Sequence, residues 1–179
     1  LGYTETFGNK ELRYEISKTY DTAKPEHILC FAGAEEGIYV AMRVLLRHND
    51  HAIIVVPNYQ AAETIPLDIC EVSGVPLNPE EKWSLDIDRV KNEIRPNTKL
   101  ISINFPNNPT GAILARERLD ELIRICRYRG LYLFSDEVYR LLERDTQLRL
   151  PQVADINDEN RRGTRLNSSH FLTSYAASC

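Results

Sequence analysis

The chain has 179 residues, with 22 basic side chains against 26 acidic ones and a formal net charge of −4. This balance excludes a strongly basic nucleic-acid-binding protein. Hydrophobic residues make up 42% and charged residues 27% of the chain, the usual mix for a globular domain with a sizeable core. We expect a cytoplasmic location without membrane association, because no apolar stretch approaches the roughly 20 residues that cross a bilayer and the N-terminal residues lack the pattern of a signal peptide. The four widely spaced cysteines form no CxxC pair, and no metal site is predicted.

Hydrophobic periodicity predicts strands that alternate with helices. In chain order the predicted elements are a helix at 11–20, a strand at 28–31, a helix at 35–47, strands at 52–56 and 67–72, a helix at 86–94, a strand at 100–104, a helix at 116–129 and a strand at 131–134. This order indicates an α/β fold with a mostly parallel sheet and helices on both faces. His27, His48 and His51 fall near the ends of these elements, where surface or capping roles are expected.

The two ends of the chain differ from this regular middle. The first residue is Leu1 rather than Met, which suggests a start inside a longer protein. Residues 160–179 show neither helical nor strand periodicity, and residues 164–170 resemble a translated sequencing adapter. We therefore expect a partial domain over residues 1–160 and a non-native or disordered tail over residues 161–179. A disordered natural tail is the alternative.

A glycine turn precedes the second predicted helix. Gly33, Ala34 and Glu35 follow the predicted strand at 28–31, and their small side chains expose backbone N–H groups at a helix N-terminus. Such a terminus suits a phosphate, although a glycine that only turns the chain explains the same pattern. Neither GxGxxG nor GxxxxGK[ST] occurs, which disfavours a nicotinamide enzyme.

Polar or aromatic residues also follow three other predicted strands. Tyr59 follows 52–56, Asn108 lies in the turn after 100–104, and Asp136 and Tyr139 follow 131–134. Ligands of open α/β sheets bind beyond the carboxyl ends of the strands. A packed tyrosine, a generic turn and a helix cap are the alternative explanations for each one alone.

Taken in order, these pieces resemble a known family. The motifs NFPNNPTG at 104–111 and SDEVY at 135–139, and the opening Y-x4-G-x3-L-R from Tyr3, are similar to those of the class I/II aminotransferases. These are fold-type I enzymes that use pyridoxal 5'-phosphate. The resemblance covers Tyr3 to about Asp155 and identifies the chain as a fragment of their large domain.

The resemblance implies contacts with the cofactor ring. Asp136 would pair with the protonated pyridine nitrogen, so that the ring withdraws electrons from a substrate carbanion. Asn108 and Tyr139 would hydrogen-bond the phenolic oxygen, and Tyr59 would stack on the ring.

It also implies contacts with the phosphate and with partners. Gly33, Ala34 and Glu35 would lie at the phosphate, and Tyr3 would reach the phosphate of the neighbouring subunit in a homodimer. The substrates would be an amino acid and a 2-oxo acid, in amino acid metabolism and biosynthesis.

The family's Schiff-base lysine is absent. It lies downstream of the aspartate and tyrosine, whereas the last lysine here is Lys99. We therefore assign no catalytic residue and expect the chain itself to be inactive. Two alternatives stay open: another fold-type I enzyme, such as a C–S lyase, decarboxylase or synthase, and a lysine-less remnant that acts by binding.

Overall fold

The computed structural model describes residues 5–156 and 171–174. The α-helices are α1 (Lys10–Ser17), α2 (Ala34–Leu45), α3 (Gln60–Leu67), α4 (Ile87–Glu93) and α5 (Arg116–Arg129). The strands are β1 (His51–Val56), β2 (Glu71–Pro76), β3 (Thr98–Asn104), β4 (Tyr132–Asp136) and β5 (Phe171–Ser174). Short 3₁₀ helices lie at Pro25–His27, Pro79–Glu81, Thr146–Leu148 and Val153–Asp155.

The strands form one parallel sheet in the order β2-β1-β3-β4-β5. Parallel neighbours need crossover connections, and α3, α4 and α5 supply them between successive strands from β1 to β4. The register pairs Asn104 at the end of β3 with Asp136 at the end of β4. The carboxyl ends of these strands therefore meet at one edge of the sheet.

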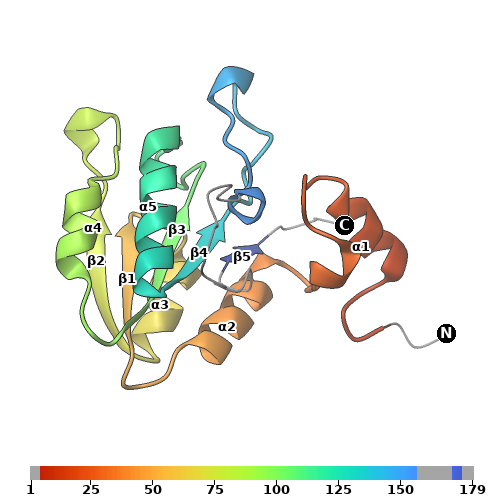
Figure 1. Cartoon of the computed structure of the whole chain (residues 1–179), viewed down its shortest axis with the longest axis horizontal. Coiled ribbons are helices and arrows are strands. Elements are labelled where there is room, and N and C mark those ends of the chain that lie inside the picture. Colours follow the sequence, from red (N-terminus) through yellow and green to blue (C-terminus); the bar gives the residue numbers. More distant parts are fainter. Residues whose placement is uncertain (1–4, 157–170, 175–179) are drawn as a thin grey trace.

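Both faces of the central strands β1, β3 and β4 are buried, as the sequence predicted. In β1, Ile53 and Val55 pack into a cluster with α4 and α5, while Ala52 and Ile54 pack into a second cluster with α2 and α3. Alternate side chains of a strand point to opposite faces, and burial on both sides explains the continuous apolar run. Figure 1 shows α4 and α5 in front of the sheet. The predicted α/β class with helices on both faces is confirmed.

Two predicted strands are wrong. Residues 28–31 are not part of the sheet: the backbone N–H of Cys30 donates to the carbonyl of Phe7 (3.0 Å), a neighbour from the N-terminal segment. Residues 67–72 instead hold the end of α3, a turn and the start of β2. The helix α3 was not predicted, since it is short and carries Pro66 in its last turn.

His51 and residues 171–174 also depart from expectation. His51 is fully buried at the start of β1, where its ring nitrogens lie 2.8 Å from Thr98 Oγ1 and 3.0 Å from Ser73 Oγ. The surface or capping role was therefore wrong for this histidine. The backbone of Phe171–Ser174 pairs with β4, although no strand was predicted there. The division of the chain at residue 160 stays a prediction.

The helix α1 lies to one side of the sheet (Figure 1). Asn9 caps it by accepting from the N–H groups of Glu11 and Leu12, at 2.8 and 3.1 Å. The buried Arg13 then donates to the carbonyls of Gly8 and Pro25, at 3.1 and 3.2 Å. This guanidinium therefore ties α1 to the chain before and after it. Among the described residues, no helix combines the length and apolar character that crossing a membrane requires.

We expect Ile54→Ala to lower the free energy of unfolding by about 2–5 kcal/mol, because it leaves a cavity between β1 and α2. Val44→Ala, at a side chain 71% exposed on α2, is the control and should change it by less than about 0.5 kcal/mol. Urea denaturation followed by circular dichroism measures both. Equal effects of the two substitutions would contradict this packing.

Candidate functional site

One cavity of about 400 Å³ opens where β1, β3 and β4 end and α2 begins. All of the predicted cofactor-binding residues that the structure describes line it: Gly33, Ala34, Glu35, Tyr59, Asn108, Asp136 and Tyr139. Tyr3 lies outside the described residues. Asn104, Ala32, Glu36 and Val138 line the cavity as well and were not predicted as site residues. Asn104 opens the NFPNNPTG motif, so its place in the sequence could have revealed it.

The N-terminus of α2 forms one wall. Gly33 caps the helix with a φ of 138°, a backbone conformation that favours glycine, and the space where a β-carbon would lie is open. Glu36 accepts from the N–H of Ala32 at 2.7 Å, which fixes the loop before the helix. The first N–H groups of an α-helix have no partner within the helix, and its dipole favours anions there. This wall can therefore hold an anionic group.

Asp136 lies at the end of β4 and is only 2% exposed. Its carbonyl accepts from the N–H of Phe105 (3.2 Å) and from Nδ2 of Asn104 (3.1 Å), while Oδ1 accepts from the N–H of Val138 (3.1 Å). No helix follows, so the helix-cap explanation does not apply. The bonds to its carbonyl fix the backbone of Asp136, and the N–H of Val138 holds its carboxylate in place. A buried carboxylate is a strong partner for a cation.

Three asparagines lie at or just after the end of β3. Asn104 and Asn107 hold the surrounding loops by hydrogen bonds, whereas Asn108 lines the cavity. Asn104 Oδ1 accepts from the N–H of Asn108 at 2.7 Å. Asn107 donates from Nδ2 to the carbonyls of Pro57 (2.9 Å) and Asn104 (3.2 Å), and its Oδ1 accepts from Oγ1 of Thr110 (2.6 Å). These bonds join the loops after β1 and β3. The backbone of Asn108 is thereby held, and this residue lines the cavity.

Tyr59 follows β1 and interacts with the α2 wall. Its hydroxyl donates to Oε2 of Glu35 at 3.4 Å, and the negative charge of Glu35 is the main cause that raises the pKa of the Tyr59 phenol. Carboxylates of Glu35, Glu36 and Asp136 line the cavity, and the described lining contains no lysine, arginine or histidine. The described walls are therefore electronegative apart from the backbone N–H groups of α2.

The fold and this site define a class of protein. A family model for aminotransferase class I and II matches residues 1–170, so the chain belongs to this family. The match extends past residue 155, where the resemblance was expected to end.

Individual relatives agree with this assignment. An aspartate aminotransferase of Sulfurisphaera tokodaii is 30% identical over 149 residues, which cover 77% of this chain and 36% of the relative. An arginine–pyruvate transaminase of Pseudomonas aeruginosa is 29% identical over 97% of this chain and 46% of its own length. Among solved structures, a pyridoxal-phosphate-dependent aminotransferase of Streptococcus suis has a TM-score of 0.80 at 35% identity, over 87% of this chain and 41% of that one. The chain thus spans less than half the length of these relatives.

We expect Asn107→Ala to lower the free energy of unfolding by about 1–3 kcal/mol, because it leaves the carbonyl of Pro57 without its donor and separates two loops of the site. Asn92→Ala, at an exposed position of α4, is the matched control and should have little effect. Urea denaturation compares the two. If Asn107→Ala proved as mild as the control, these side-chain bonds would not stabilise the loops.

Proposed function

We propose that the cavity binds pyridoxal 5'-phosphate and that the full-length protein transfers an amino group from an amino acid to a 2-oxo acid. The observation that carries this proposal is the position of Asp136, a nearly buried carboxylate in the same cavity as the N-terminus of α2. One cavity thus offers a partner for a cationic ring nitrogen and a place for an anionic phosphate. Both are needed by this cofactor.

The chain's residues fit the ring of the cofactor. Asp136 would accept a hydrogen bond from the protonated pyridine nitrogen and so keep it protonated. Asn108 and Tyr139 line the same cavity and would hydrogen-bond the phenolic oxygen, while Tyr59 would stack on the ring. When bound, the cofactor supplies an electron sink for negative charge at the substrate α-carbon.

The phosphate would rest on α2. The backbone N–H groups of Ala34 and Glu35 belong to the first turn, so the helix leaves them available as donors. Ala34 brings no hydroxyl, and phosphate binding by this wall therefore depends on the backbone. Positive charge for the phosphate would come from outside the described lining.

The reaction class rests on the relatives. The same ring contacts would serve a lyase, a decarboxylase or a synthase, but the relatives named above are aminotransferases and a transaminase. We place the lysine that moves the substrate proton, and the arginines that bind substrate, in a part of the protein beyond this chain. The resemblance further supports a homodimer with a role in amino acid metabolism and biosynthesis, in which Tyr3 reaches the neighbouring subunit's phosphate. The cytoplasmic location stays a prediction.

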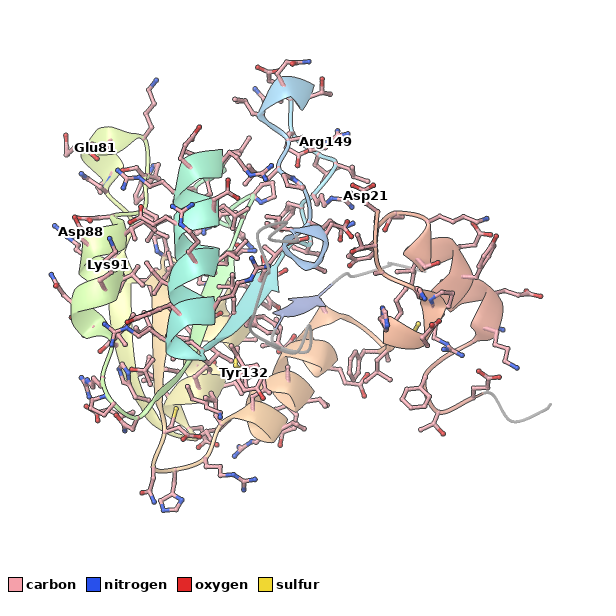
Figure 2. The ribbon with its side chains drawn as sticks, viewed as in Figure 1. Asp21, Glu81, Asp88, Lys91, Tyr132 and Arg149 are labelled. Atoms are coloured by element: carbon pink, nitrogen blue, oxygen red, sulfur yellow. The ribbon has the colours of Figure 1, made fainter. Side chains whose placement is uncertain are left out.

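We expect the chain to bind pyridoxal 5'-phosphate weakly, and Asp136→Asn to weaken binding about 10-fold to 100-fold, the usual value of a charged hydrogen bond. Asp88→Asn is the control, because the Asp88 side chain is 84% exposed on the outer side of α4 (Figure 2). Equilibrium dialysis with absorbance detection measures the dissociation constants.

Absence of binding by the unsubstituted chain would refute the proposed cofactor site. Equal affinities of the Asp136→Asn and Asp88→Asn variants would refute the role of Asp136. Borohydride treatment of the mixture should not attach the cofactor specifically to one lysine, because no lysine follows Lys99 in the chain.

We expect Glu35→Gln to strengthen binding of pyridoxal 5'-phosphate several-fold and to affect pyridoxal, which lacks the phosphate, much less. Two unit charges about 7 Å apart at an effective dielectric constant of about 40 repel each other by roughly 1 kcal/mol. Glu11→Gln, at an exposed position of α1, is the control. Parallel dialysis with both ligands gives the ratio of affinities, and an unchanged ratio in Glu35→Gln would show that this charge does not reach the phosphate.

A further inference from the structure

The end of β4 carries two carboxylates that face different cavities. Asp136 lines the cavity described above, whereas Ser135 and Glu137 line a second, small cavity of about 30 Å³. Glu137 is 5% exposed, and its Oε1 accepts from Oγ of Ser135 and from the N–H of Val153, both at 3.0 Å. Glu137 is thus fixed from one side and has no part in the proposed cofactor contacts.

Two residues that line the small cavity, Glu137 and Arg140, carry buried polar atoms for which the described residues offer no hydrogen-bond partner. Oε2 of Glu137 and both Nε and Nη1 of Arg140 are buried, and none of them has a hydrogen-bond partner in the part of the chain that the structure describes. Glu137 and Arg140 line the same cavity, whose other walls include the apolar side chains of Phe105, Leu119 and Leu150. Buried polar atoms without partners are costly, and a cavity of this size with Glu137 and Arg140 among its lining residues has room for one or two water molecules.

The same region holds the segment that follows α1. The carbonyl of Thr19 accepts from Nη2 of Arg140 (3.1 Å) and from Nε2 of Gln152 (2.6 Å). The carboxylate of Asp155 accepts from the N–H groups of Asp21 (2.9 Å) and Thr22 (2.8 Å). Figure 2 shows Asp21 on the side of α1 that faces the segment carrying Arg149. Residues 19–22 are therefore attached to the region after β4.

We propose that the small cavity is a buried water site linking Glu137 to Arg140, and that through this link Glu137 positions both the turn at 136–140 and residues 19–22. A water molecule there accepts from one of the two unpartnered Arg140 nitrogens and bonds to Oε2 of Glu137, so that it bridges the two side chains. Arg140 in turn holds Thr19, and its N–H donates to the carbonyl of Glu137 at 2.9 Å. The inference rests on the proposed function only in that Asp136 and Tyr139 of this turn are cofactor contacts.

The charge of Glu137 makes the link sensitive to pH. Burial is the main cause that raises the pKa of the Glu137 carboxyl from 4.5 to about 7, while the positive charge of Arg140 lowers it and the negative charge of Asp155 raises it. Glu143, paired with Arg149 at 3.1 Å, also lines the cavity. The closed structure binds more protons than an opened one between pH 4.5 and about 7, so its protection falls as the pH rises through this window.

Hydrogen exchange of the chain itself, followed by mass spectrometry, tests the link. Glu137 makes none of the hydrogen bonds described for residues 19–22. We expect Glu137→Leu to speed amide exchange there about tenfold, while Glu137→Gln, which keeps a polar group in the cavity, keeps the slow rate. Glu117→Gln, at an exposed position of α5, is the control. Unchanged exchange at residues 19–22 in Glu137→Leu would overturn the proposal.

The pH profile supplies a second test that does not need the leucine variant to fold. After correction for intrinsic exchange, protection of residues 19–22 in the unsubstituted chain should fall between about pH 5 and pH 7, whereas Glu137→Gln should show no such fall. Identical profiles would overturn the proposal. Neither test requires the cofactor, so a failure of this proposal can be distinguished from a failure of the proposed function.

Discussion

The structure depends on one constraint: parallel strands that are buried on both faces must end at the same edge of the sheet. Their interior side chains have only packing to satisfy, and the first polar groups of the chain come where the strands stop. Asn104, paired in register with Asp136, marks that boundary on β3 and β4. Loops that are far apart in the sequence therefore meet at one edge of the sheet. The side chain of Asn107 hydrogen-bonds the carbonyl of Pro57, 50 residues away in the chain, and so joins the loops after β1 and β3.

Sequence periodicity predicted the elements whose burial is continuous or one-sided. The strand β3 and the helix α5 were found because their apolar residues face a core on both sides or along one stripe. The prediction at 28–31 was wrong because an apolar run does not reveal its partner: these residues pair with the N-terminal segment instead of the sheet. His51 was misplaced because its burial depends on hydroxyls of Ser73 and Thr98, which only the folded chain brings near.

The site residues could be predicted where they belong to sequence motifs. They were harder to predict where their role is to hold a neighbouring backbone N–H group. Tyr59, Asn108 and Asp136 lie together as their order in the sequence indicated. Asn104 and Glu36 line the same cavity, yet their contacts with backbone N–H groups are local geometry that residue type alone does not show. Asp136 and Glu137 are adjacent carboxylates, but their side chains lie at different cavities at the end of β4. Their different roles follow from this placement, which residue type alone does not show.

The electronegative lining of the larger cavity has a consequence for how salt acts on it. Anion sites in proteins are usually surrounded by cations, and added salt weakens them by screening attraction. Here Glu35, Glu36 and Asp136 line the same cavity as the N-terminus of α2, and the described lining contains no cationic side chain. Salt would screen repulsion between these carboxylates and an entering phosphate, so moderate ionic strength would favour anion entry into this part of the protein. If added salt instead weakened anion binding in a complete protein, this would indicate that its remaining residues contribute cationic side chains to the site.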